Sequence, residues 1–214
     1  MTDDLDQLRT LARGALAALE ASRRRIDDLN VYPVPDGDTG TNLALTVRAV
    51  VEDLERLEPT DRPTLAHELT RAALMGARGN SGVIFSQIVR GAAEVLGAAS
   101  RSDVPTVASA FRGASDAAYR AVRRPVEGTM LTVIREMAEE AGSTRQTSVA
   151  DLLAQVLARG EDALARTPEL LEVLREARVV DAGGAGLVEI VRGLLAAVRG
   201  EPLPELPAET EAGI

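Results

Sequence analysis

The chain has 214 residues, of which 24 are Lys or Arg and 33 are Asp or Glu, and its formal net charge of −9 disfavours nonspecific attraction to nucleic acid or anionic lipid. It contains no cysteine, and all of its Lys and Arg residues are Arg, which excludes thiol nucleophiles, thiolate metal sites and lysine-dependent kinase or Schiff-base sites. With two Tyr, two Phe and no Trp, it also lacks the stacking surfaces that bind single-stranded nucleic acid.

The opening residues MTDDLDQLRT contain no basic segment followed by an apolar run, so no secretory signal is recognised there. Charged residues interrupt every hydrophobic segment before it reaches the ~20 residues of a membrane span. Together with the absence of cysteine, these features predict a cytoplasmic protein.

Apolar residues recur at spacings of three and four from Asp3 to Leu29, which is the pattern of one buried helix face. The same periodicity, with proline and glycine at the breaks, predicts later helices at 41–57, 62–77, 81–99, 104–123, 129–141, 148–165, 168–177 and 185–200. No convincing run alternates as a strand does. The predicted fold class is all-α, an up-and-down antiparallel barrel or bundle of about eight helices, because short connections favour antiparallel neighbours.

The domain organisation predicted from composition is simple. Residues 1–200 form the helical domain, and residues 201–214, EPLPELPAETEAGI, form a proline-spaced acidic tail that resembles a linker.

The gap PVPDGDTGTN departs most from the helical composition. Asp36 and Asp38 flank Gly37, so both carboxylates could turn toward one centre, and two such oxygen donors favour Mg²⁺. The competing interpretation is an Asx-rich turn that caps the next helix. A calcium EF-hand also begins D-x-D, but Thr41 and Val47 occupy the positions where that loop needs Gly and Glu.

Two helix starts, GTN and GARGNSG, would each present free backbone N–H groups and a positive dipole end to an anion. Thr41, Asn42, Asn80 and Ser81 add short donors, so a phosphate could be held without lysine. Either start alone is better explained as an N-cap, but both beside an aspartate pair favour nucleotide. Arg78 fits a phosphate ligand and a solvated helix-end charge equally well.

Two further breaks, VEGTM and VVDAGGAG, carry capping residues. Asp181 precedes the last helix and on spacing is best explained as its N-cap, although it could also shape a base or phosphate pocket. Thr129 is likewise typical of an N-cap. His67 lies mid-helix, where a lone histidine is more often structural or exposed, and is given no role.

Taken in order, LNVYPVPDGDTGTN, LMGARGNSGVIFSQIVRG, PVEGTMLTVIREMAEEA and ARVVDAGGAGLVEI resemble the nucleotide-binding domain of the dihydroxyacetone-kinase L family. Within that family the chain is most similar to the amino-terminal domain of the kinase subunit of bacterial fatty acid kinases. The resemblance extends to about Gly200. It implies an eight-helix barrel that binds ATP or ADP at one end through a pair of Mg²⁺ ions.

The resemblance also assigns residues. It implies metal ligands at Asp36 and Asp38, and at the family's third, upstream aspartate this chain has the neutral Asn30 with a spacing one residue longer. The implied nucleotide contacts are Thr39, Gly40, Thr41, Asn42, Asn80, Ser81, Gly82, Thr129, Met130, Asp181 and Gly183. Met130 would pack on adenine.

By resemblance, the phosphate passes to the carboxylate of a fatty acid held by a separate DegV-like carrier protein, for phospholipid synthesis. An ionised carboxylate needs no general base, which suits a site without Lys or His. Dihydroxyacetone fits less well, because that branch uses a histidine-bearing substrate domain. Since the fatty acid kinase subunit continues beyond this domain, the chain is expected to be weak or inactive alone. A non-enzymatic nucleotide-sensing module and a purely structural helical domain are the alternatives.

Overall fold

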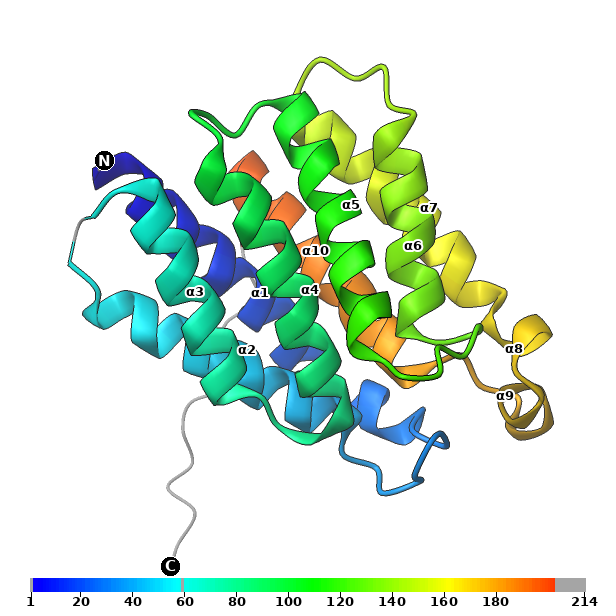
Figure 1. The fold of residues 1–214 in the computed structure, drawn as a ribbon. Helices are drawn as coiled ribbons and strands as arrows, with labels where there is room; N and C mark the ends of the chain where they lie inside the picture. The colour runs from blue at the N-terminus through cyan, green and yellow to red at the C-terminus, as the bar shows by residue number, and fades with distance from the viewer. Residues whose placement is uncertain (1, 59, 203–214) are drawn as a thin grey trace, which may run out of the picture.

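The computed structural model describes residues 2–58 and 60–202, and within these it is built from helices alone (Figure 1). Ten helices occur in the described part of the chain. Their bounds are α1 Thr2–Asp28, α2 Thr39–Arg56, α3 Arg62–Gly76, α4 Gly79–Ala98, α5 Val104–Ala121, α6 Met130–Gly142, α7 Val149–Ala165, α8 Thr167–Leu170, α9 Glu172–Ala177 and α10 Ala182–Arg199.

Short polar side chains cap the starts of several of these helices. Asp61 accepts a hydrogen bond of 2.8 Å from the backbone N–H of Thr64 at the start of α3, and Asp103 does the same for Thr106 in α5 at 3.1 Å. Ser148 caps α7 in the same way. Each cap satisfies a backbone donor that the helix itself leaves free, which fixes where the helix begins.

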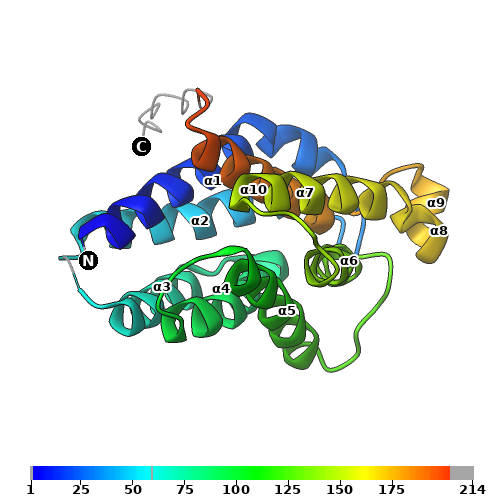
Figure 2. The ribbon, with the colours of Figure 1, turned by 90° about the horizontal axis from the view of Figure 1, so that it is seen from above.

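The eight long helices run alternately up and down and close on themselves. Each of α1 to α7 packs against the next, α7 packs against α10, and α10 returns to α1. Figure 2 shows α1, α2, α7 and α10 in one layer and α3, α4 and α5 in the other. The predicted all-α up-and-down barrel is therefore confirmed.

Close helix contacts depend on glycine at two crossings. A Cβ on Gly193 of α10 would lie 2.2 Å from the carbonyl oxygen of Gly14 in α1, and a Cβ on Gly91 of α4 would lie 2.1 Å from that of Gly113 in α5. The helix backbones touch there, so any side chain larger than hydrogen would push the two helices apart.

The predicted helix bounds agree with the structure to within two residues, with two exceptions. The helix predicted at 168–177 is two short helices, because Leu171 takes an extended conformation with φ −130° and ψ 110°. The last helix begins at Ala182 rather than at 185, so glycines predicted as a loop form its first turn. The helix ends at Arg199 with Gly200 as its C-cap, and residues 203–214 of the predicted tail lie outside the described residues.

None of the helices in the described ranges is both long and apolar enough to cross a membrane.

Candidate functional site

Four helices begin at the same end of the barrel, because every second helix of an up-and-down barrel has the same direction. These are α2, α4, α6 and α10, whose first turns lie toward the lower right of Figure 1. A Cβ on Gly186 of α10 would lie 2.3 Å from Leu43 of α2, and one on Gly183 would lie 3.0 Å from Met130 of α6. Four positive dipole ends therefore lie at one end of the barrel, which favours a bound anion there.

The loop before α2 carries the predicted aspartate pair. Gly37 has φ +67°, a conformation that side chains rarely adopt, and it allows the chain to reverse between Asp36 and Asp38. Asn30, at the start of this loop, is buried and donates a hydrogen bond of 2.6 Å from Nδ2 to Oδ1 of Asp36. The structure thus brings together all three residues predicted as metal ligands.

A third aspartate, which the sequence reasoning missed, belongs to the same region. Asp27, in the last turn of α1, accepts hydrogen bonds from the backbone N–H of Thr41 at 2.9 Å and from its Oγ1 at 2.8 Å. One signal could have revealed it. Asp27 and Asp28 end a helix, where the dipole favours cations and disfavours carboxylates, so an aspartate there is explained by something beyond the helix.

The electrostatics of the aspartates follow from their proximity. Partial burial raises the pKa of Asp38, its hydrogen bond with Asn42 lowers it, and the carboxylates of Asp36 and Asp27 raise it further, with a net rise. Within residues 2–58 and 60–202, no arginine forms an ion pair with Asp27, Asp36 or Asp38. Nearby negative charges without a cation are unfavourable, and a divalent ion would relieve their repulsion.

This cluster is looser than a finished metal site. Among the described residues, no three acidic or histidine side chains converge closely enough to hold an ion by themselves. The donors that are present are carboxylate oxygens with an adjoining amide, which is the chemistry that suits Mg²⁺ completed by water and phosphate oxygens.

The starts of α2 and α4 are joined beside the aspartates. Oγ1 of Thr46 donates to the carbonyl of Asn42 at 2.7 Å and accepts from the backbone N–H of Arg78 at 3.1 Å. Gly79 has φ +58°, and a Cβ there would lie 2.4 Å from Nδ2 of Asn42. The side chain of Arg78, just before α4, is exposed and donates to the carbonyl of Ala77.

On the far side of the four helix starts, Asp181 connects α10 to its neighbours. Its side chain is 5% exposed and accepts a hydrogen bond of 2.6 Å from the N–H of Gly184, and its own N–H donates to Thr167 at 3.0 Å. Burial raises the pKa of Asp181 to about 6, although hydrogen bonds from the backbone of Gly184 and Met130 lower it. The predicted capping role is confirmed.

The predicted nucleotide contacts divide into two groups by exposure. Thr41, Asn42, Asn80, Ser81 and Thr129 are exposed or half-buried. The others are buried: Thr39, Gly40, Gly82, Met130, Asp181 and Gly183.

The buried group positions the exposed one. Met130 is 3% exposed and packs against Gly183, and a Cβ on Gly82 would lie 2.5 Å from Oγ1 of Thr46. In this conformation a ligand can reach backbone or side-chain atoms of the exposed group directly, whereas the buried group holds the four helix starts together.

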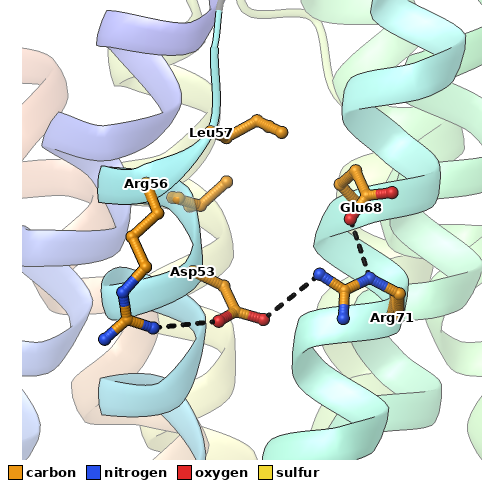
Figure 3. Close-up of a pocket in the computed structure, with 6 residues that line it drawn as sticks. Asp53, Arg56, Leu57, Glu68 and Arg71 are labelled. Carbon is orange, nitrogen blue, oxygen red and sulfur yellow. Dashed lines mark hydrogen bonds and ion pairs between the residues drawn. The ribbon is translucent and has the colours of Figure 1, made fainter.

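A pocket of about 190 Å³ between α2 and α3 is not part of this region (Figure 3). Its charged side chains pair with one another: Asp53 with Arg56 and Arg71, each at 3.5 Å, and Arg71 with Glu68 at 2.7 Å. None of the predicted site residues lines it, and its charges are already neutralised.

The comparison with known families decides the classification. Residues 33–196 match the DAK2 domain. The chain belongs to the DAK2 family. The DAK2 match begins in the aspartate loop and ends in α10, so it includes all four helix starts.

Relatives of this DAK2 domain are longer proteins. It is 41% identical over 202 residues to the protein YloV of Bacillus subtilis, a match that covers 92% of this chain and 36% of YloV. It is 43% identical over 180 residues to an uncharacterized protein of Staphylococcus saprophyticus, covering 83% of this chain and 33% of that protein. The chain therefore spans about a third of the length of these relatives.

The DAK2 domain also resembles solved structures. The dihydroxyacetone kinase from C. freundii in complex with AMP-PNP and Mg²⁺ superimposes with a TM-score of 0.65 at 17% identity, over 88% of this chain and 33% of that one. The native form of the same enzyme gives a TM-score of 0.67, over 89% and 34%. At this identity the likeness establishes a shared fold.

Proposed function

We propose that this DAK2 domain binds ATP with Mg²⁺ and transfers the terminal phosphate to an acceptor held by another protein or domain. The observation that carries the proposal is the aspartate cluster, which pairs with no arginine among the described residues and lies at the end of the barrel where four helices begin. The clustered carboxylates favour a bound metal ion, and the helix N-termini favour a bound anion. Magnesium with a nucleotide polyphosphate is the ligand that satisfies both.

Asp36 and Asp38 are the proposed metal ligands, with Asn30 beside Asp36 and Asp27 near enough to raise the pKa of Asp38. The family resemblance adds that two ions bind. When bound, magnesium neutralises the phosphate oxygens and draws negative charge from the leaving group. Asp27 also fixes Thr41, which holds the first turn of α2 in register with the aspartate loop.

The phosphates are proposed to lie against the first turns of α2 and α4, where Thr41, Asn42, Asn80 and Ser81 supply donors. Thr129 and the turn around Gly183 would border the base, with Met130 and Asp181 fixing the local backbone from behind. Arg78 is exposed just before α4 and could swing toward a phosphate, since its present partners are backbone carbonyls of its own turn.

For the acceptor we propose a fatty acid carboxylate presented by a DegV-like carrier, giving an acyl phosphate. An ionised carboxylate attacks without losing a proton, so the reaction needs positioning and charge neutralisation rather than a base. This agrees with the residues present, because the single histidine, His67, is exposed on α3 and is not among the site residues. The chain spans about a third of the length of its relatives. We therefore propose that other regions of these longer proteins dock the carrier, and we expect weak transfer by this chain alone.

Dihydroxyacetone is the alternative acceptor, favoured by the structural likeness to dihydroxyacetone kinase. A module that binds nucleotide without turning it over is the second alternative. Phosphate transfer in the presence of each acceptor separates the three.

The direct test is calorimetric titration of ATP into the chain, with Mg²⁺ and then with excess chelator, for the wild type, Asp36→Asn and Asp6→Asn. Asp6 is an exposed aspartate at the opposite end of α1 and serves as the matched control. We expect binding that requires the metal, is lost in Asp36→Asn and is unchanged in Asp6→Asn. Binding that survives both chelation and Asp36→Asn would contradict the proposed site.

A further inference from the structure

The connection between α5 and α6, residues 122–129, is held by side chains to which the proposed phosphoryl transfer gives no role. The carboxylate of Glu127 lies at their centre. Tyr119 of α5 donates its hydroxyl to Oε1 of Glu127 at 2.8 Å. Arg135 of α6 donates to Oε2 of Glu127 at 3.2 Å and to the hydroxyl of Tyr119 at 3.3 Å. One carboxylate thus ties the connection to the helix on either side of it.

Thr132, in the first turn of α6, extends this network into the backbone. Its hydroxyl donates to Oε2 of Glu127 at 2.6 Å and accepts a hydrogen bond of 2.8 Å from the N–H of Gly128. Thr132 is fully buried. Because the hydroxyl is donor and acceptor at once, its two partners fix its orientation, and Gly128 cannot shift without breaking a buried hydrogen bond.

The turn at Gly128 is confined on its other side by the segment that follows α7. Gly128 has φ +83°, and a Cβ there would lie 2.9 Å from the carbonyl oxygen of Thr167 and 2.8 Å from Cβ of Leu171. The hydroxyl of Thr167 accepts a hydrogen bond from the N–H of Asp181, the N-cap of α10. The turn before α6 is therefore packed against a residue that also holds the turn before α10.

The protonation states of the network suit its hydrogen bonds. Burial raises the pKa of Glu127, but hydrogen bonds from Thr132, Tyr119 and Arg135 outweigh it, so this pKa lies below its ordinary value. Burial and the hydrogen bond to Glu127 raise the pKa of Tyr119 to about 12. At neutral pH the carboxylate is charged and accepts, and the phenol is protonated and donates.

The stability of the barrel accounts for little of this arrangement. The side chain of Glu127 is 47% exposed and that of Arg135 is 38% exposed, so the ion pair between them is screened by water and stabilises the fold only weakly. The helices α5 and α6 already pack against each other, and both contribute apolar side chains to the core. The feature that the network does fix is the course of the connection, which leads directly to Thr129.

Thr129 stands where the proposed site needs a wall for the nucleoside. The phosphates are proposed to lie against the first turns of α2 and α4, so the base and ribose, at the other end of the nucleotide, fall beside the starts of α6 and α10. Thr129 is half-buried at the start of α6, and its hydroxyl donates to the carbonyl of Val126 at 2.7 Å. Both residues belong to the connection that Glu127 and Thr132 hold.

On the basis of the nucleotide site proposed for this domain, we propose that Glu127 and Thr132 are positioning residues for the nucleoside. They hold the turn at Gly128 and Thr129 in the conformation that receives the base and ribose. They have no part in the metal and phosphate half of the site.

The two halves of the site are therefore separable by ligand. ATP contacts both halves, whereas inorganic tripolyphosphate has three phosphates without base or ribose and contacts only the aspartates and the starts of α2 and α4. A variant that loosens the turn weakens the binding of ATP and spares that of tripolyphosphate. A variant that loosens the barrel weakens the binding of both.

The test is calorimetric titration of ATP, and separately of inorganic tripolyphosphate, into the 214-residue chain with excess Mg²⁺. Thr132→Val removes the hydroxyl with almost no change in shape, and Thr132→Ser restores it. Glu127→Ala removes the carboxylate. Glu139→Ala is its matched control, because Glu139 also pairs with Arg135, at 2.9 Å, but has no hydrogen bond to residues 122–129 in the part of the chain that the structure describes.

We expect Thr132→Val and Glu127→Ala each to bind ATP at least about tenfold more weakly than the wild type, and to bind tripolyphosphate within about twofold of it. Thr132→Ser should recover ATP binding to within about threefold of the wild type. Glu139→Ala should match the wild type for both ligands.

Equal losses for ATP and tripolyphosphate would mean that the network only supports the fold, which overturns the proposal. Unchanged ATP binding in either variant overturns the role of that residue. In both cases the wild type still binds its ligands, so the proposed function stands. A wild type that binds neither ligand refutes the proposed function itself, and the positioning role with it.

Discussion

Asp27, in the last turn of α1, holds Thr41, in the first turn of α2, through two hydrogen bonds of 2.9 and 2.8 Å. One carboxylate thereby caps the next helix and adds its charge to the field at Asp38. This contact joins the two ends of the aspartate loop, which connects α1 to α2.

Replacing the hydroxyl of Thr41 tests that contact. We expect Thr41→Val to lower the free energy of unfolding by about 1.5 kcal/mol, because the hydroxyl donates to a charged acceptor that is partly shielded from water. Thr70→Val is the control, since that hydroxyl donates to the carbonyl of Ala66 within its own helix and is expected to cost less than about 0.5 kcal/mol. Urea unfolding of the three proteins measures both. Equal losses would mean that the contact with Asp27 adds nothing.

Repulsion among the aspartates predicts opposite effects with and without metal. Without divalent ions, Asp38→Asn is expected to leave the melting temperature unchanged or raise it, because one of the neighbouring negative charges is removed. With Mg²⁺ and ATP in excess, the wild type should gain stability and the variant should not. Thermal melts under both conditions give the comparison. A variant that melts lower without metal would indicate that the carboxylate has a structural role instead.

Gly79 and Gly200 provide a matched pair, because both have positive φ, +58° and +65°, but different surroundings. An alanine at either position is expected to cost about 1 kcal/mol through backbone strain. At Gly79 the new Cβ would meet the side chain of Asn42, whereas at Gly200 no atom of the described residues lies within 4 Å.

We therefore expect Gly79→Ala to weaken nucleotide binding in calorimetry and Gly200→Ala to leave it unchanged. If the two variants bind nucleotide equally, Asn42 does not need its present position for binding.

The buried carboxyl of Asp181 predicts a pH dependence of stability. Burial raises its pKa to about 6 in the fold, above the ordinary value of 3.8, so the fold favours the protonated form. The contribution of Asp181 is full below the ordinary value and is lost as the pH rises through about 6. Each unit of pH in this range changes the free energy of unfolding by about 1.4 kcal/mol, so raising the pH from about 4.5 to about 6 removes about 2 kcal/mol of the stability that Asp181 contributes.

Asp181→Asn keeps an oxygen that can accept from Gly184 but cannot titrate. The stability of the wild type relative to this variant should therefore fall between about pH 4.5 and about pH 7.5, as measured by urea unfolding at both values. Asp181→Ala, which also removes the cap, should be less stable than Asp181→Asn by about 1 kcal/mol at either pH. A difference between wild type and Asp181→Asn that is independent of pH would show that the carboxyl is not perturbed.

Local patterns in the sequence determined much of this protein. Helical periodicity, capping residues and short connections predicted the all-α barrel, because each depends on residues within a few positions of one another. The aspartate pair and the glycine-rich helix starts were recognisable for the same reason. The prediction of one helix at 168–177 was wrong at Leu171, where apolar periodicity continues across a break.

Only the tertiary structure decided which of these features meet. Closure of α10 on α1 completes the barrel, with four helix starts at one end, and the packing of α2 against α1 brings Asp27 to Thr41, fourteen positions along the chain. The closed barrel also contains an apolar cavity of about 390 Å³, which is lined by side chains from all eight long helices. No single helix defines that space. Periodicity shows which face of a helix is buried, but the packing of distant helices decides what that face buries against and where the barrel is left unfilled.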